Sequence, residues 1–201
     1  MEGFLLLFVF MDSPISPAQQ IADRFGAELI PEFRGETAVL LKDSSKIASL
    51  LEFAKTHLLF DMLLDVSSVD HLGSEPRFEV VYHLYSFARK SYLRVKTLVN
   101  EEKAVLPTAT GVWRGADWHE REVYDMMGIR FEGHPDLRRI LMWDSYPHFP
   151  LRKEFPLAGI PTRDGHAGAA PMAGGPFVTR PGDMTTLDRE PRAKGETDSV
   201  V

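Results

Sequence analysis

Cysteine is absent from the chain, and this absence removes several classes of function. Without cysteine the sequence cannot supply a disulfide framework, a thiolate nucleophile or the ligands of a cysteine-bound iron–sulfur cluster. If the protein serves electron transfer, the electrons must therefore travel through other chains.

Positive charge is also scarce. Lys and Arg number 23 against 29 Asp and Glu, so the formal net charge is -6. A nucleic-acid binder usually carries a basic face. The glycine-rich patterns that cradle phosphate groups, G-x-G-x-x-G and the P-loop, are missing as well. We therefore expect the chain to bind neither nucleic acids nor nucleotides.

Long apolar runs are lacking too. The longest, Phe4–Met11, has eight residues, whereas a bilayer crossing needs roughly 20. No positive charge precedes it, so it is also a weak signal peptide. We predict an N-terminal arm over residues 1–15, with Met11 as an alternative start. We expect a soluble protein on the cytoplasmic side, attached to membranes only through partners.

What is present suits one folded domain. The chain has 201 residues, 44% of them apolar, which is ordinary for a globular protein. Ser16 and Pro17 predict the start of a helix that Gly26 ends. Ser44 and Ser45 predict the cap of a second helix, whose apolar face has helical spacing: Ile47, Leu50, Leu51, Ala54 and Leu58.

Strands are predicted around these helices, over residues 27–30, 37–41, 61–69, 78–85 and 92–99. The fourth alternates most clearly, with Phe78, Val80, Tyr82 and Leu84 on one face. The order helix, two strands, helix, three strands predicts an α+β domain over residues 16–106, in which two helices pack on one face of a mixed sheet.

A charged helix follows, from Asp117 to Gly128. Asp117 is predicted to cap its first turn, with Glu120 completing a capping box, and Gly128 to end it. Its ionised residues are flanked by large apolar ones, which suggests a helix held between surfaces: Glu120, Arg121, Glu122 and Asp125.

Two further elements are predicted after this helix. A short strand is predicted over residues 129–131. Another helix is predicted to follow it, beginning at Pro135 and having an apolar stripe of Leu137, Ile140 and Leu141. The three prolines between Tyr146 and Leu157 favour an extended strip. Such a strip, presenting Phe149, Leu151, Phe155 and Leu157, suits a groove on another protein.

These residues together resemble the C subunit of respiratory complex I, the proton-pumping NADH:quinone oxidoreductase. The likeness is most specific over residues 107–157. It is carried by Glu120-Arg-Glu122, Tyr124-Asp125, Gly128, the run from Phe131 to Leu141, and the run from Pro150 to Leu157.

The resemblance implies a structural subunit of the peripheral arm with no catalytic residue and no cofactor of its own. NADH, FMN, iron–sulfur clusters and quinone would belong to the assembled complex. The implied partners are the equivalents of the D and B subunits, with the ferredoxin-like I subunit as a further candidate. A homologous subunit of an energy-converting hydrogenase or ferredoxin-linked complex is an alternative.

The residues that carry the likeness are the predicted partner-contact residues. They are Trp118, Glu120, Arg121, Glu122, Tyr124, Asp125, Gly128, Phe131, Gly133, His134, Pro135, Arg138, Arg139, Pro150, Leu151, Arg152, Lys153, Phe155 and Pro156.

Their charges allow two interpretations. One is a free-standing acid/base enzyme; the other is a buried or interfacial ion-pair network. Residues 113–155 hold seven Lys or Arg and eight Asp or Glu, and this balance favours pairing, because an unpaired buried charge costs several kcal/mol. His119 and Glu120 begin like a zinc-protease helix, but Val123 stands where the second histidine is required. His119, His134 and His148 are expected to be ordinary packed or surface residues.

The last part of the sequence differs in composition. From Leu157 onward, 12 of 45 residues are Gly or Pro, a share close to that of irregular chains. We predict an extended tail over residues 158–201, partly ordered on partner subunits.

Overall fold

The computed structural model describes residues 15–155. The predicted tail, Pro156 and all of the predicted N-terminal arm except Ile15 lie outside this range. Residues up to Tyr146 form one compact unit, and those from Pro147 belong to a second.

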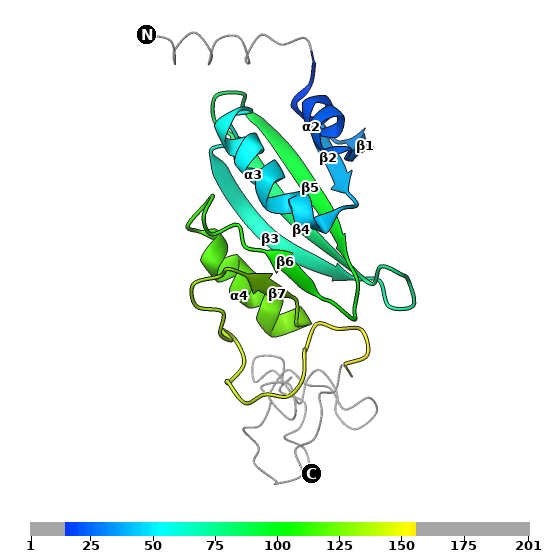
Figure 1. Cartoon of the computed structure of the whole chain (residues 1–201), viewed down its shortest axis with the longest axis vertical. Coiled ribbons are helices and arrows are strands. Elements are labelled where there is room, and N and C mark those ends of the chain that lie inside the picture. Colours follow the sequence, from blue (N-terminus) through cyan, green and yellow to red (C-terminus); the bar gives the residue numbers. More distant parts are fainter. Residues whose placement is uncertain (1–14, 156–201) are drawn as a thin grey trace, which may run out of the picture. The chain divides into compact units, whose positions relative to one another are not determined.

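Two helices cover one face of the main sheet (Figure 1). Helix α2, Pro17–Phe25, begins as predicted, since the Ser16 hydroxyl accepts the Gln19 N–H, and it ends at Gly26 with φ 70°. Helix α3, Ile47–Thr56, follows a 3-10 turn η1 at Ser44–Lys46. Here the predicted serine cap is wrong: the Asp43 carboxylate accepts the Ser45 N–H and hydroxyl, as an Asp at a turn readily does.

The five predicted strands are confirmed, with shifted ends. They are β1 Glu28–Phe33, β2 Glu36–Leu41, β3 Met62–Asp70, β4 Phe78–Ser86 and β5 Ser91–Val99. Their order in the sheet is β1-β2-β5-β4-β3, with β2 and β5 parallel and the other pairs antiparallel. The predicted α+β class with a mixed sheet is confirmed. Strand β1 runs through Pro31 because an edge strand tolerates a missing N–H.

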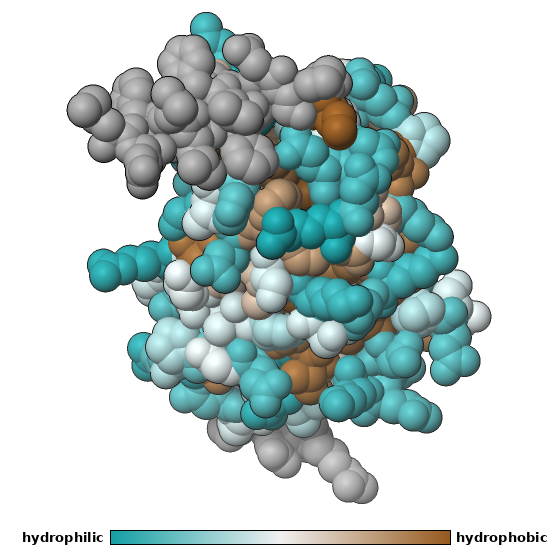
Figure 2. All heavy atoms as spheres, turned by 45° about the horizontal axis from the view of Figure 1, so that its top comes forward, coloured by the Kyte–Doolittle hydropathy of each residue, from teal (hydrophilic) through white to brown (hydrophobic). Residues whose placement is uncertain are grey.

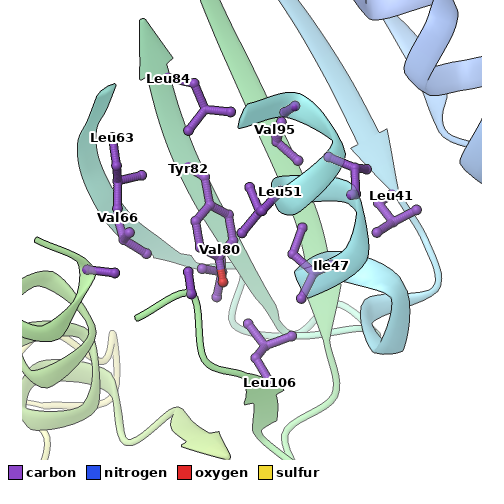
Figure 3. Packing of buried hydrophobic residues seen from close by; sticks show 14 of the residues in the cluster. Leu41, Ile47, Leu51, Leu63, Val66, Val80, Tyr82, Leu84, Val95 and Leu106 are labelled. Carbon is purple, nitrogen blue, oxygen red and sulfur yellow. The ribbon is translucent and has the colours of Figure 1, made fainter. Parts of the chain in front are cut away.

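The core lies between the helices and this sheet (Figure 3). The alternation predicted for β4 is confirmed: Phe78, Val80, Tyr82 and Leu84 are all fully buried. Ile47 and Leu51 of α3 pack on the same cluster. Each large apolar side chain buried in this way contributes about 1.5–3 kcal/mol.

A second layer, made of a two-stranded sheet and a helix, completes the unit, and the sequence predicted only part of it. Strand β6, Val105–Pro107, pairs in parallel with β7, Arg130–Glu132, and helix α4, Ala116–Met127, connects them. Strand β7 matches the predicted short strand, shifted by one residue, whereas β6 was missed because its sequence, Val-Leu-Pro, has no polar alternation and ends in a proline. Leu106 of β6 and Val123 of α4 reach the common core.

The face drawn in Figure 2 is mostly hydrophilic where it is coloured. On the face drawn in Figure 2, apolar side chains emerge between polar ones as small patches. The large exposed apolar residues include Phe33, Phe87, Trp118, Leu141 and Leu151. Within residues 15–155, no helix has the length and apolar character that a membrane crossing requires.

Candidate functional site

The candidate site is the polar network around α4, and the start of this helix differs from the prediction. Gly115 precedes its first residue, and Asp117 lies within the first turn without capping it. Its end is as predicted, because Gly128 adopts φ 77° and its N–H binds the Tyr124 carbonyl. The predicted capping box is wrong, since Glu120 points into the protein and binds other groups.

Glu120 joins α4 to the loop after β6. Its carboxyl oxygens accept hydrogen bonds from the Thr108 hydroxyl at 2.5 Å and from the Ala109 N–H at 2.6 Å. The residue is fully buried. Burial raises the pKa of this carboxyl to about 7; the two hydrogen bonds oppose the rise, and the negative charge of Asp117 adds to it.

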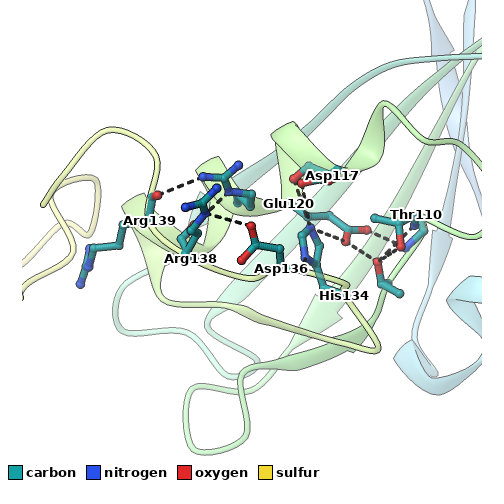
Figure 4. Close-up of polar contacts among 10 residues, drawn as sticks. Thr110, Asp117, Glu120, His134, Asp136, Arg138 and Arg139 are labelled. Carbon is teal, nitrogen blue, oxygen red and sulfur yellow. Dashed lines mark hydrogen bonds and ion pairs between the residues drawn. The ribbon is translucent and has the colours of Figure 1, made fainter. Parts of the chain in front are cut away.

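His134 lies on the other side of Glu120 (Figure 4). Its Nε2 is 3.2 Å from the Asp117 carbonyl oxygen, 3.5 Å from an Asp117 carboxylate oxygen and 4.0 Å from Glu120 Oε2. Its Nδ1 accepts the Asp136 N–H at 3.0 Å. The imidazole therefore connects the turn after β7 to the first turns of α4.

Asp125 organises the chain that follows β7. One of its carboxylate oxygens accepts the consecutive N–H groups of Ile140, Leu141 and Met142 at 3.0, 2.7 and 2.8 Å. The other pairs with the Arg139 guanidinium at 2.6 Å. Burial alone would raise the pKa of Asp125, but these bonds outweigh it and hold the pKa below its ordinary value.

Arg121, one turn earlier on α4, binds the backbone carbonyl groups of the same segment. Its guanidinium donates to the carbonyl oxygens of Arg138 and Arg139 at 3.1 and 3.2 Å, and it stacks on the Trp118 ring at 5.0 Å. The predicted helix from Pro135 is therefore wrong: residues 135–142 form a turn, an irregular stretch and a bend, because α4 side chains take the backbone groups that a helix would pair internally.

The charged residues thus form a network inside one chain. Arg139 also donates to the carbonyl oxygens of Asp125 and Tyr146. The arginines of this segment therefore bind backbone carbonyl groups as well as carboxylates, and only some of the charges predicted to pair do so. Glu120 has no ion pair with a lysine or arginine among residues 15–155. The pairing interpretation holds for Asp125 and Arg139, while Arg121 bonds to backbone groups instead.

The predicted strip after Tyr146 is wrong as an extended element. In this second unit the Arg152 N–H binds the Phe149 carbonyl and the Phe155 N–H binds the Arg152 carbonyl, which makes consecutive turns. The Arg152 guanidinium lies 4.5 Å from the centre of the Phe149 ring. Prolines restrict their neighbours to extended or turn conformations, and here turns result.

The predicted partner-contact residues divide by exposure. Glu120, Arg121, Asp125 and Phe131 are buried. The half-buried ones are Tyr124, Gly128, His134, Arg139, Pro150, Arg152 and Phe155. The exposed ones are Trp118, Glu122, Gly133, Pro135, Arg138, Leu151 and Lys153. Pro156 lies outside the described residues, and contact with partners stays a prediction for the whole set.

Sequence reasoning missed the groups that form hydrogen bonds with the charged side chains. Thr108 and Ala109, which bind Glu120, stand in the loop after the unpredicted β6. A Thr-Ala-Thr run carries no signal for such a bond. The receiving N–H groups of residues 140–142 belong to the backbone, so no side-chain pattern could reveal them.

The three histidines considered in the sequence lie in different surroundings. His119 Nδ1 lies 3.2 Å from an Asp65 carboxylate oxygen, His134 is beside Glu120, and His148 belongs to the second unit. Val123, at the position of the missing ligand, is buried in the core. Across the described range, no three His, Cys, Asp or Glu residues are grouped as a metal ion would need.

Comparison with known proteins links this geometry to a family. Residues 40–161 match the family described as "Respiratory-chain NADH dehydrogenase, 30 Kd subunit". The C 2 subunit of NADH-quinone oxidoreductase from Rhizobium meliloti (strain 1021) is 51% identical over 145 residues, covering 71% of this chain and 76% of the relative. The C subunit of NADH-quinone oxidoreductase from Geotalea uraniireducens (strain Rf4) is 44% identical over 151 residues, covering 74% and 91%.

Two solved structures are also similar to this chain. The trypsin-resistant fragment (1-134) of Nqo5 is similar with a TM-score of 0.54 and 35% identity, covering 59% of this chain and 95% of that one. A chain of an archaeal membrane-bound sulfane sulfur reductase, a respiratory membrane complex, is similar with a TM-score of 0.58 and 25% identity, covering 78% and 87%. The family match spans more than half of the sequence, and the chain therefore belongs to the family of the 30-kDa subunit of respiratory-chain NADH dehydrogenase, the C-subunit family of complex I.

Proposed function

We propose that this chain is a structural subunit of the peripheral arm of a bacterial NADH:quinone oxidoreductase. It holds the D-like, quinone-reducing subunit and the B-like, cluster-bearing subunit together, without a cofactor or a catalytic residue of its own. It sits on the cytoplasmic face of the membrane through these partners. The observation that carries the proposal is the likeness to C-subunit relatives, which extends over 76% and 91% of their lengths.

The state of the charged residues supports a structural role over acid/base catalysis. Glu120 and Asp125 are both fully buried, and their oxygens accept bonds from this chain's own groups. A general acid or base must come within hydrogen-bond reach of its substrate. Neither carboxylate offers that access, so the network is better suited to fixing the shape of the surface above it.

That surface lies on α4 and the segment tied to it. Trp118 is 60% exposed although its ring stacks on Arg121. Leu141 is 59% exposed although its N–H is held by Asp125. Large apolar side chains that are both immobilised and exposed are typical anchors of protein interfaces. We therefore assign the partner contact to the Trp118–Leu141 surface, defined by these two residues.

The test is co-purification of the assembled complex with a tagged copy of this chain. Trp118→Ala combined with Leu141→Ser should reduce recovery of the D-like and B-like subunits at least tenfold, while the thermal stability of the purified variant stays near that of the wild type. Phe87→Ala is a matched control, because Phe87 is also 62% exposed but lies in the turn after β4. Full recovery with the double variant would reject this surface.

Membership of a different membrane complex is the second candidate. The likeness to a chain of the archaeal sulfane sulfur reductase complex favours it. The partner subunits distinguish the two: recovery of NADH-oxidising subunits supports the first candidate, whereas a D-like partner with four metal-binding cysteines indicates a hydrogenase-type complex. Mass spectrometry of the proteins that co-purify from membranes decides between them.

A further inference from the structure

The buried groups around Glu120 form a cluster whose response to protons the proposed structural role does not address. Glu120 itself is fully buried and accepts two short hydrogen bonds from the loop after β6. The His134 side chain is also fully buried. A buried carboxyl group is costly to ionise unless a positive charge compensates it.

Several packed elements present a neutral or acidic group to this carboxyl. Asp117 comes from α4 itself, Thr108 from the loop after β6 and His134 from the turn after β7. From β4, the Tyr82 hydroxyl is buried and has no hydrogen-bond partner among residues 15–155. Burial and the charge of Glu120 both raise the pKa of Tyr82, which indicates that the two groups share one buried region.

His134 does not supply the missing positive charge in this arrangement. Its Nδ1 accepts the Asp136 N–H, so the ring hydrogen must be on Nε2, the atom that faces Asp117 and Glu120. A doubly protonated ring would place two hydrogens against each other at Nδ1. While this bond is kept, the Nε2 hydrogen faces the Asp117 carbonyl oxygen at 3.2 Å, and the uncharged ring lies 4.0 Å from Glu120 Oε2.

We propose that Glu120, with His134, Asp117 and Thr108, is a proton-responsive clasp that joins α4 to the β6–β7 layer. With a proton on Glu120 the Glu120 carboxyl is neutral and the clasp is tight; without it, a second negative charge lies beside that of Asp117 and loosens the clasp. No partner subunit is needed for this behaviour.

The sign follows from the two states of the chain. In the unfolded chain Glu120 titrates near its ordinary value of 4.5, and in the folded chain its pKa is about 7. The folded state therefore binds the proton on Glu120 more tightly, so the contribution of Glu120 to stability falls as the pH rises from about 4.5 to about 7 and changes no further above that.

Chemical unfolding of the full chain between pH 4.5 and 8 tests the clasp. Glu120→Gln keeps the shape but cannot ionise. Relative to this variant, the unfolding equilibrium constant of the wild type should rise at least tenfold across the interval. Glu122→Gln, an exposed neighbour on the same helix, should keep the wild-type profile. Identical profiles for Glu120→Gln and wild type would overturn the proposal.

A second measurement does not depend on how well that variant folds. Carbon-13 NMR of glutamate carboxyl groups reports the titration of Glu120 directly, and its midpoint should lie at least one pH unit above those of the exposed glutamates. Thr108→Val removes a donor to the ionised carboxyl and should move the midpoint higher still. A midpoint in the ordinary glutamate range, or no response to Thr108→Val, would refute the clasp.

Discussion

Asp125 shows how much one side chain can organise in this protein. Asp125 is fully buried in α4, and both of its carboxylate oxygens have partners. These are the Arg139 guanidinium and three backbone N–H groups. Hydrogen bonds to an ionised group are about twice as strong as neutral ones. A single carboxylate thereby replaces the internal bonding that residues 140–142 would have in a helix.

Replacement of Asp125 by Ala should therefore be severe. It leaves the largely buried Arg139 guanidinium without its carboxylate and frees three N–H groups, so we expect the free energy of unfolding to fall by about 3–5 kcal/mol. Urea denaturation measures this loss. Asp136→Ala is the control, because its pair with Arg138 is exposed and should change stability by less than about 1 kcal/mol.

The same residue predicts acid sensitivity. The hydrogen bonds hold the pKa of Asp125 below its ordinary value of 3.8. Its contribution is therefore complete above about pH 4 and is lost as the pH falls through the folded-state pKa. Acid titration followed by near-UV circular dichroism should show wild-type unfolding that is steeper with pH than that of Asp125→Asn; equal slopes would contradict this role of the carboxylate.

At the scale of elements, α4 depends on a defined end. Gly128 adopts φ 77° and closes the last turn by binding the Tyr124 carbonyl. From there the chain turns directly into β7, which pairs in parallel with β6. The helix end therefore sets the register of the small sheet as well as the length of α4.

Gly128→Ala should lower the free energy of unfolding by about 1–2 kcal/mol, because an L-residue with a side chain is disfavoured in the left-handed conformation. Thermal unfolding measures the change. Gly111→Ala is a matched control, since its φ lies outside the left-handed region and an added Cβ meets nothing within 4 Å. A similar loss in both variants would mean that chain flexibility, and not the helix end, is responsible.

At the scale of the whole molecule, the described core belongs to the first compact unit. The residues of the core cluster all lie between Ala18 and Phe131, in the first compact unit. The tail predicted over residues 158–201 lies outside the described residues, and we predict that it holds partners and does not stabilise this core.

Truncation after Leu157 should therefore separate stability from assembly. We expect a melting temperature within about 2 °C of the full chain, a shift that corresponds to roughly half a kcal/mol for a domain of this size. Recovery of partner subunits from membranes should fall severalfold. A large loss of thermal stability on truncation would show that the tail belongs to the fold.

The sequence by itself determined the main α+β layer and the family. Period-two alternation in β4, the Ser16 cap and the Gly26 end are local signals, because each depends on residues a few positions apart. Its local signals failed where distant groups compete for the backbone. The apolar stripe of Leu137, Ile140 and Leu141 indicated a helix, yet Asp125 and Arg121 take the N–H and carbonyl groups that such a helix would need.

Only the tertiary structure decided how the charged residues are used. The spacing of Asp117 and Glu120 fits a capping box, but the fold turns Glu120 inward to Thr108 and Ala109, on a strand-end loop that no pattern predicted. The physical reason is that a buried carboxyl must find its donors wherever the chain brings them close. Which residues come close depends on contacts far apart in sequence, and these are fixed only when β6, β7 and α4 pack together.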